Sequence, residues 1–448
     1  MTLIFTFGGL CLISMVLILG FAAYVFERRL SGPLASCFMF YLVFFVGDML
    51  AQGESTSYCV SLGQPLSLNP IALMSISTFL GLVVYIILSI CFYRKNLRAG
   101  TPCGLRNRLV CSDSVAKMAR RASVMTLCGV FLILAPCIIL GINPIFNPLG
   151  FRQFMQSQGM AYIMIPTFML MKSLGALFAV YVVICGGALK GAKCAPLIFK
   201  VALAVSGIFL ILSGFSSGVF LILIFYLLFK NLVWGAPIRG ILFLIAILML
   251  PFTAMYTTYR ESARSGEAVE IGTIVSNFSD GNFIHQLSDR FDYFDLSILG
   301  GGSLLLGNAE PEKLADLFIQ PIPRALLPDK PLNFSSLMTS RVFPEVFSQG
   351  VTGNYGGFNE FLLYFGLNSV FMYGMFWGFV MFVAGFAFKR SSGNIENGLL
   401  YLLLIYGYST AYICGYLNDM PLPCLLISAP FVIYMTRKIN FSSNRSVR

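Results

Sequence analysis

Long apolar stretches dominate this chain, and they constrain its fold more than any other feature. Within a bilayer the backbone must satisfy its own hydrogen bonds, so an apolar stretch of roughly 20 residues crosses as a helix. We therefore predict an all-α polytopic membrane protein with about eleven transmembrane helices, within a range of ten to twelve. The predicted spans are 3–26, 33–50, 70–93, 122–141, 160–188, 196–213, 216–230, 237–255, 366–388, 398–416 and 421–436.

The charge of the chain indicates how these spans are oriented. Only 11% of the 448 residues are charged, and the formal net charge is +11. Eight Lys and Arg residues fall within 94–121, and basic connections stay in the cytoplasm. Counting spans from there places the N-terminus outside and the C-terminus in the cytoplasm. Topology thus accounts for the positive charge, and nucleic acid is not a predicted partner.

One connection is far longer than the others and separates three regions. Residues 1–255 hold the first eight spans, 256–365 form a large outer segment, and 366–448 hold the last three spans and a cytoplasmic tail. Apolar positions at helical spacing predict a helix over 284–299, and a second, shorter helix is expected over 311–320. The run of glycines in 300–307 predicts a flexible or tightly turned connection. Ionisable groups gather in this outer segment, which favours chemistry at the outer membrane surface.

The outer segment holds five arginines and two lysines. Arginine binds phosphate groups through planar, bidentate contacts, so a lipid diphosphate is one ligand that this composition fits. Arg260 and Arg264 are four residues apart, on one face of a continuing helix. Arg324 and Lys330 lie in the proline-rich stretch "IPRALLPDKPLN", a stiff loop suited to preorganised charge stabilisation. The simpler alternative is that the arginines pair with the many acids of the same segment.

Other side chains of the outer segment have less specific signals. Glu360 is a candidate general base or a helix-terminus acid. Asp292 is a candidate for activating an acceptor hydroxyl, and His285 titrates near neutral pH, although a lone histidine is more often structural. Amide and phenol groups suited to sugar hydroxyls are carried by Asn354, Tyr355 and Asn359.

Metal and nucleotide sites are not predicted. The chain has one histidine, and it has neither a metal-ligand motif nor a glycine-rich phosphate loop. We expect no cofactor. Lys172, within a predicted span, is costly to place in lipid and is expected to reach the interface or a lipid phosphate.

Two stretches carry a resemblance to a known family. "IPRALLPDKP" and "TGNYGGFNEFLLYFGLNSVFMYG" resemble the P-R-x-x-x-P-x-K-P and G-x-x-x-E-x-x-x-x-F-G runs of Wzy-type O-antigen polymerases and related polysaccharide polymerases. Arg290 and Gly301 also fit an Arg-x10-Gly pattern of some members. The architecture covers the whole chain, whereas the similar stretches lie within about 290–375.

The resemblance implies a C-type membrane glycosyltransferase of the bacterial inner membrane, with the large segment in the periplasm. The expected reaction polymerises oligosaccharide repeat units linked to undecaprenyl diphosphate into O-antigen or a related surface polysaccharide. One lipid-linked glycan is the donor, another is the acceptor, and undecaprenyl diphosphate is released. A chain-length regulator and a flippase are the implied partners.

The residues expected to act in catalysis are Arg264, Arg290, Arg324 and Glu360. The residues expected to bind substrate are Arg260, His285, Asp292, Lys330, Asn354 and Tyr355. The general base stays open among Glu360, Asp292 and His285. Two other functions stay open as well: an O-antigen ligase that transfers to lipid A-core, and a flippase or transporter of the lipid-linked oligosaccharide.

Overall fold

The computed structural model of the 448-residue chain is helical throughout its described regular structure. The described residues are 7–27, 32–50, 70–93, 112–139, 141, 161–185, 187–212, 216–234, 293–306, 319, 327, 329, 331–348, 355–391, 398–399, 401–402, 430–431 and 434.

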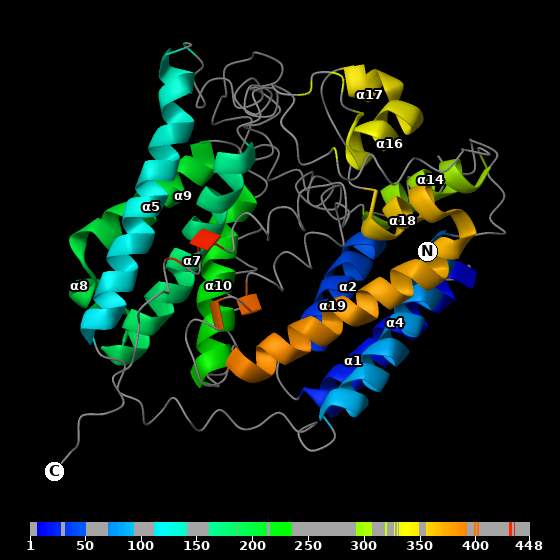
Figure 1. Ribbon diagram of the computed structural model, residues 1–448, viewed down its shortest axis with the longest axis horizontal. Helices are drawn as coiled ribbons and strands as arrows, with labels where there is room; N and C mark the ends of the chain where they lie inside the picture. Colours follow the sequence, from blue (N-terminus) through cyan, green and yellow to red (C-terminus); the bar gives the residue numbers. More distant parts are fainter. Residues whose placement is uncertain are drawn as a thin grey trace. The chain divides into compact units, whose positions relative to one another are not determined.

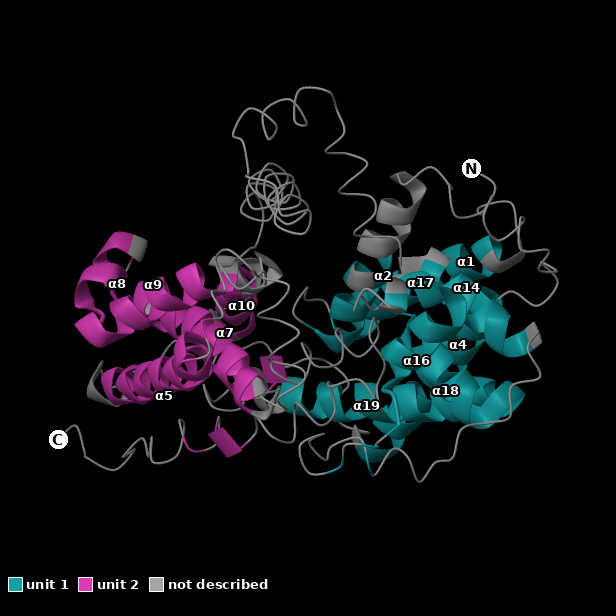
Figure 2. Cartoon of the chain, turned by 90° about the horizontal axis from the view of Figure 1, so that it is seen from above, with its two compact units in different colours: residues 1–100, 276–389, 404–425 teal, residues 101–275, 390–403, 426–448 magenta. Residues whose placement is uncertain are grey.

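The chain forms two compact units, each assembled from separate stretches of sequence (Figure 2). The first comprises 1–100, 276–389 and 404–425, and the second comprises 101–275, 390–403 and 426–448. The predicted outer segment, 256–365, is therefore divided between the units near residue 276. Most of this segment belongs to the same unit as the first spans.

The first unit contains the described N-terminal helices up to Tyr93, the described helices of the outer segment, and the long helix that follows this segment (Figure 1). Its helices are α1 (Phe7–Phe26), α2 (Pro33–Leu50), α4 (Pro70–Tyr93), α14 (Tyr293–Leu306), α16 (Phe334–Val342), α17 (Pro344–Ser348), α18 (Gly357–Phe365) and α19 (Ser369–Ser391). Pro33 and Pro70 stand at the first position of their helices, where the missing amide hydrogen costs nothing.

A close contact between α4 and α19 is central to the first unit. A Cβ on Gly378 would lie 2.5 Å from the carbonyl oxygen of Gly81 and 2.8 Å from the Cβ of Val84. The Ser77 hydroxyl donates a 2.6 Å hydrogen bond to the carbonyl of Val370. Small residues thus let the two backbones approach closely, as is common between membrane helices.

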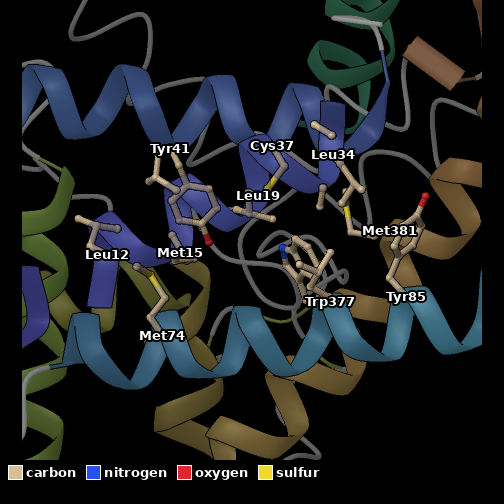
Figure 3. Packing of buried hydrophobic residues seen from close by; sticks show 14 of the residues in the cluster. Leu12, Met15, Leu19, Leu34, Cys37, Tyr41, Met74, Tyr85, Trp377 and Met381 are labelled. Carbon is tan, nitrogen blue, oxygen red and sulfur yellow. The ribbon is translucent and has the colours of Figure 1, made fainter. Parts of the chain in front are cut away.

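The core of the first unit lies between α1, α2, α4, α18 and α19. Trp377, Tyr41 and Tyr373 are completely buried there, and Figure 3 shows Tyr41 and Met74 directed into the space between α2 and α4. The Tyr41 and Thr78 hydroxyls are 3.2 Å apart and share a hydrogen bond. A polar pair thus joins α2 to α4 inside this core.

The second unit is a bundle around α7 (Figure 1). Its helices are α5 (Ser112–Ile139), α7 (Ala161–Ile184), α8 (Ala188–Cys194), α9 (Leu197–Leu212) and α10 (Ser216–Trp234). α7 contacts the other four helices, and Gly175 allows it to approach the backbone of α10 at Ile222. Buried apolar residues of α5, α7, α9 and α10 form the core.

The helices identify the chain as a helical, membrane-embedded protein. Within the described residues, four helical segments are long and apolar enough to cross a membrane, at Gly9–Phe26, Pro70–Phe92, Val115–Ile139 and Gly357–Lys389. Shorter apolar helices occur at Pro166–Val182, Leu197–Leu210, Ile222–Leu232 and Leu296–Leu305. The predicted total of eleven spans and their orientation stay predictions.

One local expectation was wrong. The predicted connection over 300–307 is helical as far as Leu306, because α14 continues through its three glycines. The span predicted at 122–141 corresponds to the apolar part of α5, which begins earlier, at Ser112, with polar residues.

Candidate functional site: a helical cluster in the outer segment

Two of the ten predicted site residues, Tyr355 and Glu360, lie within the described part of the chain. The other eight lie outside the described residues: Arg260, Arg264, His285, Arg290, Asp292, Arg324, Lys330 and Asn354. Their roles stay predictions. The structure does show the helices that adjoin several of them in sequence, and these helices belong to one cluster.

The cluster contains three helices, each next to a predicted site residue. α14 begins at Tyr293, directly after Asp292 and three residues after Arg290. α16 begins at Phe334, after the stretch that contains Arg324 and Lys330. α18 contains Glu360. α14 contacts α16 and α18, and also α2 and α4 of the same unit.

Asparagine side chains anchor two of these helices. Asn333, the last residue of "IPRALLPDKPLN", caps α16 by accepting a 2.9 Å hydrogen bond from the Ser336 amide. The Nδ2 group of Asn359 in α18 donates to the carbonyl oxygen of Ser297 in α14, at 2.7 Å. It also donates to the carbonyl of Tyr355, at 2.7 Å, and more weakly to the Ser297 hydroxyl, at 3.4 Å. Asn359 is completely buried, and its hydrogen bonds join α18 to α14 and to Tyr355, two residues before α18 begins.

Glycines explain how α14 comes so close to its neighbours. A Cβ on Gly301 would lie 2.5 Å from the Cβ of Pro70, at the start of α4, and 2.7 Å from the Oδ1 of Asn359. A Cβ on Gly300 would lie 2.8 Å from the Tyr355 ring. The two glycines are therefore packing positions inside a helix, where any larger residue would displace a neighbour.

Tyr355 fills the centre of the cluster. Its side chain is completely buried and packs with apolar residues from α16 and α18: Phe334, Met338, Leu363 and Tyr364. Burial raises the pKa of the Tyr355 phenol above its ordinary value, and nearby Thr339 of α16 partly opposes this shift. Although Thr339 is close enough to affect the pKa, the Tyr355 Oη has no partner of good hydrogen-bond geometry in the described part of the chain.

Glu360 lies in the first turn of α18 and is also completely buried. An acid at this position interacts favourably with the positive end of the helix dipole. The preceding residue Gly356, with φ of 87°, adopts a conformation that favours glycine and lets the chain turn into α18. At the other end, Gly366, with φ of 55°, separates α18 from α19. Glu360 therefore lies on a short helix of its own at the entrance to the last long described span.

The described part of the site is a scaffold. Tyr355, Asn359 and Glu360 have no solvent exposure. Asn359 joins helices through its hydrogen bonds, and the predicted roles of Tyr355 and Glu360 stay predictions. Within the described residues no group of three or more His, Cys, Asp or Glu could hold a metal ion. Ser297, Gly300, Gly301 and Thr339 belong to the scaffold but were not predicted as site residues. The glycine run was the one sequence signal that could have indicated close packing.

Comparison of the chain with protein-family profiles, with curated proteins and with solved structures gives no match.

Proposed function

We propose that this protein polymerises oligosaccharide repeat units linked to undecaprenyl diphosphate at the periplasmic face of the bacterial inner membrane. One observation carries the proposal. The pattern of Arg290 and Gly301 extends into α14, the stretch with Arg324 precedes α16, and the second resembling stretch contains α18; these helices pack as one cluster. Stretches more than 60 residues apart in sequence would then contribute side chains to one site.

The proposed chemistry is a displacement at the anomeric carbon of the donor sugar. The bond between this carbon and the diphosphate oxygen breaks, and a bond to the acceptor hydroxyl oxygen forms. The hydroxyl proton passes to a base, and undecaprenyl diphosphate leaves as the anion. Negative charge develops on the departing diphosphate in the transition state. Arg264, Arg290 and Arg324 would stabilise this transition state more strongly than they stabilise the bound donor, which is what catalysis requires. Arg260 and Lys330 would support binding of the diphosphate.

The buried residues would act by positioning. Asn359 and Gly301 connect α18 with α14 and α4, and α14 starts three residues after Arg290. A small displacement of α14 would therefore alter where Arg290 can reach. Glu360, Asp292 and His285 are the proposed bases, in that order, and a base role for Glu360 would require the acceptor hydroxyl to gain access to a side chain that is enclosed here.

Two alternatives use the same lipid-linked substrate. A ligase would use the same arginines but transfer the glycan to lipid A-core. A flippase would be expected to line a central path with charged groups. Within the described residues, the buried Asp, Glu, Lys and Arg side chains are those of Glu27, Lys172 and Glu360. So few buried charges favour the polymerase over the flippase.

The lipopolysaccharide of a strain that lacks the gene would separate these functions. A polymerase deletion leaves lipid A-core bearing a single repeat unit, and the wild-type gene restores the ladder of longer chains. If the deletion instead leaves bare core while polymer accumulates on undecaprenyl diphosphate, the protein is a ligase. Repeat units trapped on the cytoplasmic face would identify a flippase.

A further inference from the structure

The connection between α7 and α9 forms one end of the second unit. The short helix α8 joins the end of α7 to α9, which begins at Leu197 (Figure 1). A Cβ on Gly191 would lie 2.9 Å from backbone atoms of Tyr181 and Val182, so α8 packs against the end of α7. The rings of Tyr181 and Phe199, with centroids 5.6 Å apart, bring the first turn of α9 to the same place. The end of α7, all of α8 and the start of α9 therefore lie together.

The last turns of α10 lie at this end as well. Gly175 of α7 packs against the backbone of Ile222 in α10. About one turn later in both helices, the rings of Phe178 and Tyr226 have centroids 5.8 Å apart. Residue numbers thus rise in the same direction along the two neighbouring helices, and Lys230 of α10 lies near the level at which α7 ends.

The first turns of α5 reach the same end, because α5 runs in the direction opposite to α7. One core cluster combines the later half of α5 and the later part of α9 with the first half of α7. Val130 and Ile133 of α5 and Phe209 of α9 pack there with Met171 of α7. The beginning of α5 is then directed toward the opposite end of the bundle, where α7 finishes and α9 starts.

Basic side chains gather at this end, and we call the group the basic end. Its seven members come from four helices: Lys117, Arg120, Arg121, Lys190, Lys193, Lys200 and Lys230. All are exposed except Arg121 and Lys230, which are partly exposed. The five described helices of this unit contain one acidic residue, Asp113 of α5. The basic end therefore carries a strong positive charge that the fold assembles from separate stretches of sequence.

Large apolar side chains are exposed among these charges. Leu189 and Leu197 are 82% and 75% exposed, one beside Lys190 and the other three residues before Lys200. The Lys200 Nζ donates a 3.3 Å hydrogen bond to the carbonyl of Lys193, which holds its ammonium group at the end of α8. Exposed leucines interleaved with lysines are typical of a segment that lies in the boundary between headgroups and acyl chains.

We propose that the basic end binds anionic phospholipids in preference to zwitterionic ones. Its charge is complementary to a lipid with a net negative headgroup, and each basic residue near such a lipid surface favours binding by roughly fivefold. The ammonium group of a zwitterionic lipid such as phosphatidylethanolamine cancels this attraction. Leu189 and Leu197 would contact the acyl chains while the lysines bind the headgroup phosphate. The basic end is predicted to face the cytoplasm, so the lipids would come from that leaflet.

Native mass spectrometry of the full-length protein in detergent tests the proposal. The protein is stripped of co-purified lipid and titrated with phosphatidylglycerol, which is anionic, or with phosphatidylethanolamine of the same acyl chains. One variant combines Lys190→Gln, Lys193→Gln and Lys200→Gln. Lys193→Gln and Arg341→Gln form a matched pair, since each removes one exposed charge, the first from the basic end and the second from the other unit. Melting curves without added lipid establish that the variants are folded.

We expect the wild type to bind phosphatidylglycerol several-fold more tightly than phosphatidylethanolamine, and the triple variant to lose this preference. Lys193→Gln should weaken phosphatidylglycerol binding by up to roughly fivefold, and Arg341→Gln should leave it unchanged. The proposal is overturned if the wild type binds both lipids alike, in which case the charge would suit a soluble anion or an acidic protein segment instead. It is equally overturned if the folded triple variant keeps the wild-type preference, or if Arg341→Gln weakens phosphatidylglycerol binding as much as Lys193→Gln does.

Discussion

The side-chain amide of Asn359 donates a 2.7 Å hydrogen bond to the backbone carbonyl of Ser297, 62 residues earlier in the chain. Asn359 belongs to the stretch that most resembles polysaccharide polymerases, and Ser297 lies on the helix that begins just after Arg290 and Asp292. The bond is completely buried. It therefore fixes the relative position of two stretches that would share one active site.

Removal of the Asn359 amide should destabilise the protein. Asn359→Ala would leave the buried carbonyls of Ser297 and Tyr355 without this donor, at a cost of about 1–3 kcal/mol. Ser297→Ala is the matched control, because it keeps the carbonyl that accepts the 2.7 Å bond and removes only the hydroxyl at 3.4 Å. The apparent melting temperature in detergent should fall clearly for Asn359→Ala and little for Ser297→Ala. Equal falls would show that the bond to the carbonyl is not what stabilises the contact.

Substitution of Gly301 should displace α14. The Cβ of Gly301→Ala would meet the Pro70 ring and the Asn359 side chain, and such overpacking costs about 1–3 kcal/mol. Gly207→Ala in α9 is the control, since a Cβ there meets nothing within 4 Å, and alanine in a helix stabilises by about 0.5–1 kcal/mol relative to glycine. Melting in detergent should shift down for the first variant and slightly up for the second. A stabilised Gly301→Ala would contradict the close packing of α14 against α4.

The stability of the connection between α1 and α2 should depend on pH. The Glu27 carboxylate accepts hydrogen bonds from the Leu34 amide, at 2.7 Å, and the Ala35 amide, at 2.9 Å. Burial nevertheless raises the pKa of Glu27 from its ordinary 4.5 to about 8. The folded state then binds the Glu27 proton more tightly than the unfolded state does. The stability that this proton adds to the folded state is therefore complete below pH 4.5 and is lost as the pH rises to about 8.

Glu27→Gln removes the titrating proton and keeps a similar shape. The apparent melting temperature of the wild type should therefore decline between pH about 5 and about 8 relative to that of Glu27→Gln. If the melting temperatures of the two proteins change in parallel with pH across this interval, Glu27 has the same pKa in the folded and unfolded states.

The contact between α4 and α19 should tolerate no side chain at Gly378. Gly378→Ala would place its Cβ 2.5 Å from the Gly81 carbonyl oxygen, so the helices would have to separate. Gly385→Ala, two turns further along α19, would meet the Tyr85 ring at 3.3 Å, which a small ring movement can relieve. The yield of folded, detergent-soluble protein should drop for Gly378→Ala and stay near wild type for Gly385→Ala. Similar yields for both would argue against this crossing.

Hydropathy was sufficient to predict most of the long helices. The predicted span 70–93 coincides with α4, and the spans at 33–50, 160–188, 196–213 and 216–230 each correspond to one observed helix. These helices follow directly from the cost of exposing backbone polar groups to lipid. Hydropathy could not predict that α5 begins ten residues before its predicted start, because a helix can continue through residues that lie outside the apolar region.

The helical cluster was harder to predict from sequence. The glycines at 300–302 have low helix propensity, and Gly300 and Gly301 pack in the helix against Tyr355, Asn359 and Pro70, which are distant in sequence. Tyr355 and Glu360 were predicted as candidate residues from their residue types. Their complete burial follows from packing between α14, α16 and α18, which the residue types do not indicate. Apart from the glycine run, a single sequence holds no local signal for such contacts.

Reconstitution of the reaction would test the central claim most directly. Purified protein in lipid vesicles would be supplied with undecaprenyl-diphosphate-linked repeat units, and the glycan length and the released undecaprenyl diphosphate would be measured together. We predict glycans of two or more units with matching release of lipid diphosphate. Arg290→Ala should abolish both products, and Arg341→Ala, an exposed arginine of the same outer segment, should retain them. A folded wild-type protein that leaves the repeat units unjoined, or an Arg290→Ala variant as active as the wild type, would contradict the proposed polymerase and its site.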